Sequence, residues 1–142
     1  MPDSLAGKRV LVTRAEGQNS KLSRRLEAKN AIPVEFPTIQ IVPPENPGPL
    51  NKAIANLNTY QWLMLTSANG VKYFWQHLVA GGKGAADLQN LHIAAIGPAT
   101  AQKIETRGFS IDLMPSEHVA EALVTAMPDV SGQRILLPTA DI

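Results

Sequence analysis

Short apolar runs alternate with helical patterns along most of this chain, and this alternation constrains its fold more than any other feature. The runs expected to form strands are Trp62–Leu65, Ile93–Ile96, Phe109–Met114 and Ile135–Leu137. Helical patterns separate them, over 69–79, from Pro98 to Gly108 and over 117–127. Strands that are separated by helices pair in parallel through right-handed crossovers. We therefore predict a doubly wound, parallel α/β sheet domain, flavodoxin-like and three-layered, over residues 46–142.

Residues 1–37 show one further strand–helix–strand pattern, which begins at the apolar run Val10–Thr13. Thr38–Val42 then alternates polar and apolar residues with the period of a strand. The segment 43–49 contains four prolines in seven residues. Such a segment is typical of a stiff connector between structural units. We therefore predict that residues 1–37 belong to a separate, similar domain, joined to the larger one through a β connector over 38–45.

Two segments of the chain have similar sequences. Gly7–Ala15 (GKRVLVTRA) is matched by Gly132–Ala140 (GQRILLPTA). The match indicates either two similar units or only the basic entry and apolar core that many α/β strands share. The chain stops about one turn after the second strand, where the first copy continues into a helix. A parallel strand without a covering helix leaves an apolar face open, so we expect the domain over 46–142 to be incomplete at its C-terminus.

Composition and charge exclude several classes of function. The 13 Lys and Arg residues against 12 Asp and Glu residues give a net charge of +1, which does not support a large nucleic-acid interface. The chain has no cysteine, and its three histidines lack the spacing of metal ligands. Apolar runs are too short to span a membrane, and the N-terminus does not resemble a secretory signal. We therefore expect a cytoplasmic protein with no nucleic-acid partner, no membrane partner and no metal.

Five loops are expected at the carboxyl ends of the strands, which is the edge where open α/β sheets bind ligands. They are rich in glycine and in hydroxyl-bearing side chains: Arg14–Gly17, Thr66–Gly70, Gly97–Thr100, Pro115–His118 and Pro138–Asp141. Backbone amides at helix N-termini bind anions, and Ser or Thr oxygens add hydrogen bonds. The same residues are also ordinary helix caps. The pattern indicates either an anion-binding edge or capping alone.

Taken together, five segments resemble the uroporphyrinogen-III synthase family. They are Gly7–Arg14 (GKRVLVTR), Tyr60–Val71 (with WLMLTSANGV), Ala95–Ala101 (AIGPATA), Met114–Leu123 (MPSEHVAEAL) and Gly132–Pro138 (GQRILLP). The resemblance covers nearly the whole chain. It implies two α/β domains joined by a two-stranded connector, with the active site in the cleft between them. Residues 1–37 would be the first piece of a discontinuous domain 1, and residues 46–142 most of domain 2.

The resemblance also implies a chemistry: cyclisation of hydroxymethylbilane to uroporphyrinogen III, with inversion of ring D and loss of water. It implies no cofactor, a polycarboxylate small-molecule substrate and a monomeric intact enzyme. Thr100 matches a threonine that the family associates with activity, which makes it the candidate catalytic residue. The candidate substrate-binding residues are Arg14, Thr66, Ser67, Asn69, Gly70, Gly97 and Ser116. The family's tyrosine proton donor would lie beyond Ile142, so we expect residues 1–142 alone to be inactive.

Two other classes of function are compatible with the residues. One is a non-enzymatic α/β module that binds a small anion without transforming it. The other is an α/β interaction domain whose loops only cap helices. Thr139 also departs from the resemblance, because many relatives have arginine or glycine after the last strand.

Overall fold

The chain divides into two compact units, Met1–Pro43 and Pro44–Ile142, of which the computed structural model describes residues 5–17 and 20–140. We call them the N-terminal and the C-terminal unit. Their strands form two separate sheets, one of two strands and one of three. No helix in the described ranges is long and apolar enough to cross a membrane.

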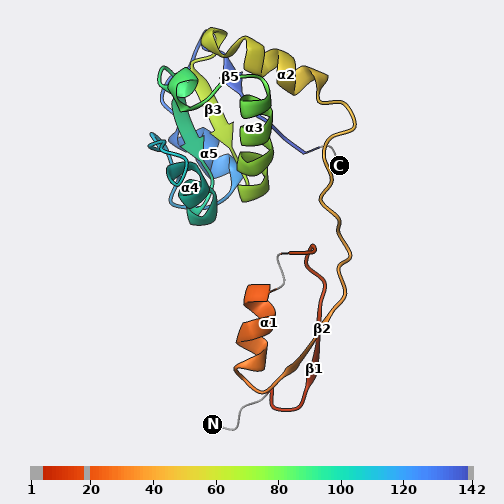
Figure 1. The fold of residues 1–142 in the computed structure, drawn as a ribbon. Helices are drawn as coiled ribbons and strands as arrows, with labels where there is room; N and C mark the ends of the chain where they lie inside the picture. The colour runs from red at the N-terminus through yellow and green to blue at the C-terminus, as the bar shows by residue number, and fades with distance from the viewer. Residues whose placement is uncertain (1–4, 18–19, 141–142) are drawn as a thin grey trace. The chain divides into compact units, whose positions relative to one another are not determined.

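The N-terminal unit is a single parallel strand pair with one crossover helix. Its elements are β1 (Arg9–Val12), α1 (Ser20–Glu27) and β2 (Ile32–Glu35) (Figure 1). Helix α1 packs against β2, and the Ser23 hydroxyl donates a 2.7 Å hydrogen bond to the Glu35 carboxylate. Ser23 is buried in that contact. The pattern seen over 1–37 in the sequence is therefore a small βαβ element.

The apolar residues of this strand pair are only partly covered. Leu11 in β1 is 60% exposed and Ile32 in β2 is 51% exposed. The strand expected over Thr38–Val42 is not formed, and all five residues are exposed. A strand needs the backbone groups of a neighbour, and at Thr38 the described residues supply only the carbonyl of Thr13. The strand that the period-two pattern predicted over 38–42 is therefore wrong for this structure.

The C-terminal unit contains the remaining elements. They are α2 (Gly48–Ala55), η1 (Leu57–Thr59), β3 (Trp62–Leu65), α3 (Ala68–Ala80), η2 (Ala85–Leu88), β4 (His92–Ala95), α4 (Pro98–Glu105), α5 (Ala120–Ala126) and β5 (Ile135–Leu136) (Figure 1). The three strands are parallel in the order β4-β3-β5. All four residues of β3 are buried, as expected for a central parallel strand covered on both faces.

Two apolar clusters show that helices cover both faces of this sheet. On one face, Leu63 and Leu65 pack in a cluster with Phe74 of α3 and Ile104 of α4. On the other face, Trp62 and Met64 of the same strand pack in a cluster that includes Leu123 of α5. Adjacent residues of a strand point to opposite faces, so β3 serves both clusters. The predicted α/β fold with a parallel sheet and helix layers on its two sides is confirmed.

The predicted strand over Phe109–Met114 is reduced to one bridge, between Leu113 and Ala94 of β4. The Asp112 carboxylate accepts the amide hydrogen of Ile93 at 2.7 Å, in the place that a backbone carbonyl would take in a continued strand. The side chain thus interrupts the ladder. The segment nevertheless runs beside β4, because the Ala95 amide donates to the Leu113 carbonyl at 2.9 Å.

The helix predicted over 117–127 begins later, at Ala120. Its N-cap residue is Val119, which has no side-chain oxygen to accept a first-turn amide. Residues 115–119 therefore remain a loop at the end of the Leu113 bridge.

The two similar segments share a backbone feature. Gly7 and Gly132 precede β1 and β5, and their φ angles are +69° and +73°. This left-handed conformation favours glycine. The similarity between the two segments therefore extends from the sequence to the turn that begins each strand.

Candidate functional site

The candidate site lies at the carboxyl ends of the strands in the C-terminal unit. The chain leaves β3 towards β4 and later returns to β5 on the other side of β3. In open α/β sheets such a change of direction leaves a crevice at the carboxyl edge, where ligands bind. The loops after β3 and β5 flank this position, and Thr139 lies in the second of them. Asp141, which was expected in that loop, lies outside the described residues.

The loop after β3 begins helix α3 with a side-chain cap. Ser67 has an extended backbone, and its hydroxyl oxygen accepts the Gly70 amide hydrogen at 3.0 Å. A Cβ at Gly70 would lie 3.1 Å from that oxygen, so glycine permits the close approach. The capping interpretation therefore holds for Ser67. Its hydroxyl hydrogen is still available to donate to an anion, as is that of the exposed Thr66, while Asn69 is half-buried.

The loop after β4 begins helix α4 without a side-chain cap. Gly97 is the N-cap residue with φ +80° and ψ 154°, and Pro98 follows it. The amides of Ala99 and Thr100 have no acceptor within the described part of the chain. Thr100 is only 4% exposed. This loop thus combines free first-turn amides with a buried hydroxyl-bearing residue, a combination suited to holding an anion.

Backbone and packing contacts bring three of these loops together. The Ile96 amide donates to the Leu65 carbonyl at 3.2 Å, which joins the ends of β3 and β4. A Cβ at Gly97 would lie 3.8 Å from the side chain of His118. The loop that contains the exposed Ser116 and His118 therefore adjoins the N-terminus of α4. No sequence pattern predicted that His118 lies beside Gly97.

Arg14 is the candidate site residue that belongs to the N-terminal unit. It is exposed and lies two residues after β1. Like the residues after β3 and β4, it follows the carboxyl end of a parallel strand.

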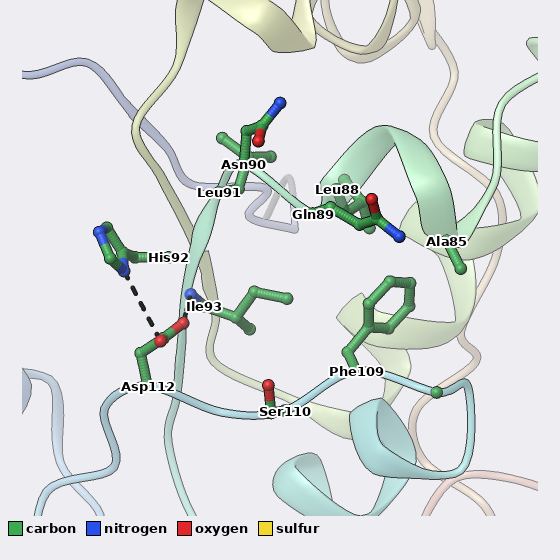
Figure 2. Close-up of a pocket in the computed structure, with 11 residues that line it drawn as sticks. Ala85, Leu88, Gln89, Asn90, Leu91, His92, Ile93, Phe109, Ser110 and Asp112 are labelled. Carbon is green, nitrogen blue, oxygen red and sulfur yellow. Dashed lines mark hydrogen bonds and ion pairs between the residues drawn. The ribbon is translucent and has the colours of Figure 1, made fainter.

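A pocket that the sequence did not predict lies at the opposite edge of the sheet, at the start of β4 (Figure 2). Its volume is about 370 Å³. Its lining includes His92, Ile93, Phe109 and Asp112, and Figure 2 shows the His92 ring directed towards the Asp112 carboxylate, 3.6 Å away. Asp112 also binds the Ile93 amide. Both polar groups thus fix the Leu113 segment to β4, and this is a structural role.

Two carboxyl groups with a lowered pKa lie away from the candidate site. A hydrogen bond from the Gly84 amide lowers the pKa of Asp87, in the turn before β4. Hydrogen bonds from Ser131 lower the pKa of Asp129, in the loop before β5. Both carboxylates organise turns that lead into strands. Within 5–17 and 20–140, no three His, Asp or Glu side chains are grouped as metal ligands.

Comparison with known proteins identifies the family to which this chain is similar. The model of the family described as uroporphyrinogen-III synthase HemD matches residues 20–142. The uroporphyrinogen-III synthase of Synechococcus elongatus is 41% identical over 138 residues, which cover 96% of this chain and 52% of that protein. The porphyrin biosynthesis protein HemD of Ruminiclostridium josui is 35% identical over 115 residues, 81% of this chain and 23% of that protein.

Solved structures show the same fold. The uroporphyrinogen III synthase of Thermus thermophilus aligns with a TM-score of 0.61 at 17% identity, over 96% of this chain and 53% of that one. A mutant of that enzyme aligns with a TM-score of 0.68 over the same shares. The chain thus spans about half the length of the S. elongatus and T. thermophilus proteins. From the match over residues 20–142, the chain belongs to the uroporphyrinogen-III synthase family.

Proposed function

We propose that the intact protein is a uroporphyrinogen-III synthase. It cyclises hydroxymethylbilane to uroporphyrinogen III, with inversion of ring D and loss of water, which makes it a hydro-lyase of tetrapyrrole biosynthesis. The observation that carries this proposal is the family match over residues 20–142, supported by the 41% identity to the S. elongatus synthase. A cytoplasmic location and a monomeric state remain predictions from the sequence.

The loops at the carboxyl ends of the strands in the C-terminal unit bind the carboxylate groups of the substrate. The N-terminus of α4 offers the amides of Ala99 and Thr100, and Ser67 and Thr66 offer hydroxyl hydrogens beside α3. A carboxylate at an exposed helix N-terminus gains roughly 0.3–1 kcal/mol from the helix dipole. Because the substrate carries many carboxylates, several such weak contacts add up. A chain of net charge +1 therefore needs no basic groove to bind a polyanion.

Thr100 acts on the substrate where the α4 amides hold it. Its side chain is buried at the first turn of α4, and the described residues include no acceptor for its amide. Asn69, Gly70, Gly97 and Ser116 complete the contacts of this unit. Arg14 contributes from the N-terminal unit. Catalysis then depends on holding the two ends of a linear tetrapyrrole in position for ring closure.

The two sheets correspond to two domains, of which the first is discontinuous. Residues 1–37 form its first strand–helix–strand piece, 38–45 the connector and 46–142 domain 2. The exposure of Leu11 and Ile32 supports this division, because an open apolar strand face is normally covered by further elements of the same domain.

The test is an assay of the intact protein with freshly prepared hydroxymethylbilane, followed by chromatographic separation of the two product isomers. Uroporphyrinogen III should form in excess over isomer I, which arises without enzyme. Residues 1–142 alone should yield only the isomer ratio of the uncatalysed reaction. Tight binding of the substrate by the intact protein, with no isomer III, would instead favour a non-enzymatic anion-binding module.

A further inference from the structure

The first turn of α3 contains the one Asn–Gly pair of the sequence, Asn69–Gly70. Asparagine is a thermolabile residue because its side-chain amide can be lost, and a following glycine favours this loss. Glycine has no side chain that would obstruct its own backbone nitrogen, and it adopts backbone conformations that other residues avoid. Asn69 is half-buried, so water reaches it. The pair therefore has the chemistry and the access that deamidation requires.

Deamidation at this pair proceeds through a cyclic imide. The backbone nitrogen of Gly70 forms a bond to the side-chain carbon Cγ of Asn69, and the bond from Cγ to the amide nitrogen breaks. That nitrogen leaves as ammonia and takes the proton of the Gly70 N–H. Water then opens the imide at either carbonyl. The product is aspartate, or isoaspartate, in which the backbone runs through the former side chain.

Two hydrogen bonds to Ser67 hold the pair in a conformation that prevents this attack. The Gly70 amide donates to the Ser67 hydroxyl oxygen at 3.0 Å, and the Val71 amide donates to the Ser67 carbonyl at 3.0 Å. In a helix the side chain of Asn69 tilts towards the N-terminus, away from the nitrogen of the following residue. The attack therefore requires that the first turn of α3 opens and that the Gly70 amide leaves the Ser67 hydroxyl.

We propose that Asn69 is a deamidation site and that the Ser67 cap keeps it closed. Its consequence for activity, and that part alone, rests on the proposed function. A carboxylate at residue 69 lies in the first turn of α3, beside the hydroxyl groups of Thr66 and Ser67 that are proposed to hold a substrate carboxylate. Like charges at that position repel, so the modified protein binds its substrate more weakly.

Incubation of the intact protein at mildly alkaline pH, well below its Tm, tests the proposal when it is followed by digestion and peptide mass spectrometry. Ser67→Ala should raise the deamidation rate at Asn69 about tenfold, because loss of an N-cap makes local opening of the turn more frequent. Ser67→Asp, which restores an acceptor, should return the rate to near that of the wild type. Gly70→Ala added to Ser67→Ala should slow the reaction again; the Ser67 oxygen, 3.1 Å from the new Cβ, is then absent.

Asn90 is the internal reference in the same digests, because it is exposed and is followed by leucine, which obstructs the attack. A rate at Asn69 that Ser67→Ala leaves unchanged, or that stays no faster than the rate at Asn90, overturns the proposal. Asn69→Asp, which imitates the product, should raise KM for hydroxymethylbilane at least about tenfold. An unchanged KM overturns the consequence for activity. A wild type that forms no isomer III overturns the proposed function, while the mass measurements still decide whether Ser67 protects Asn69.

Discussion

Gly97 is the residue whose backbone matters most to the candidate site. Its φ of +80° with ψ of 154° lies in a region that is almost restricted to glycine. An added Cβ would meet His118 only at an ordinary contact distance of 3.8 Å. Gly97→Ala should therefore destabilise the protein by about 1–3 kcal/mol through backbone strain rather than through a clash. Chemical denaturation of the purified variant measures this loss.

Gly84→Ala is the matched control for that substitution. Gly84 has an extended backbone with φ −154°, and a Cβ there would meet no atom within 4 Å. Its free energy of unfolding should stay within about 0.5 kcal/mol of the wild type. Equal losses in the two variants would show that the strain at Gly97 has been misjudged.

Thr100 tests whether the site needs a hydroxyl group or only a side chain of that shape. Thr100→Val keeps the branched shape of this buried residue and removes its oxygen. The variant should lose at least about tenfold in kcat while its Tm stays close to that of the wild type. Thr100→Ser, which keeps the hydroxyl and removes the methyl group, should retain more activity and lose more stability. Kinetics and thermal unfolding, measured on the same preparations, separate the loss of activity from the loss of stability. A fully active Thr100→Val enzyme would mean that the hydroxyl has no catalytic role and that the loop is only structural.

At the scale of the element, the cap of α3 has a measurable value. Ser67→Ala removes the 3.0 Å hydrogen bond to the Gly70 amide and should cost about 0.5–2 kcal/mol of stability. Ser67→Asp restores an acceptor and should recover most of the loss. Ser116→Ala, at an exposed loop serine, provides the baseline and should change stability by less than about 0.5 kcal/mol. If urea titrations give Ser67→Ala the same free energy of unfolding as Ser116→Ala, the Ser67 hydroxyl does not stabilise α3 as a cap.

The elements also show where sequence patterns suffice and where they fail. The apolar run of β3 predicted a buried strand, because burial on both faces requires such a run. The run over Phe109–Met114 predicted a strand too, but the side chain of Asp112 takes the ladder position at Ile93, and no periodicity reveals that. The alternation over Thr38–Val42 failed for another reason: a strand also needs a neighbour, and the sequence pattern does not supply one.

The candidate site was predictable to a similar extent. Parallel topology alone places Ser67 and Gly97 at the carboxyl edge, because all strands of such a sheet end there. Whether each residue caps a helix depends on side-chain orientation, which only the structure gives: Ser67 caps, and Gly97 leaves its helix open. The position of His118 beside Gly97 brings together two loops that are about twenty residues apart in the sequence, and no local pattern predicts it.

At the scale of the whole molecule, the two units differ in how much core they bury. The C-terminal unit has buried clusters on both faces of its sheet. Among the described residues of the N-terminal unit, the buried apolar side chains are Val12, Ala15 and Ala31, and two of these are alanines. A two-stranded sheet with so small a core is marginally stable by itself. We therefore expect the N-terminal unit to gain stability from further covering elements, as the proposed discontinuous domain would supply.

Amide hydrogen exchange tests this difference directly. In a polypeptide of residues 1–142, the amides of β3 should exchange at least about a hundredfold more slowly than those of β1, because β3 is central and fully buried. In the intact protein, the exchange of β1 should slow markedly while that of β3 changes little, since the completed domain 1 would cover Leu11 and Ile32. Exchange at β1 as slow as at β3 in residues 1–142 would mean that the N-terminal unit is stable without that cover. The proposal of a discontinuous first domain would then lose its physical basis.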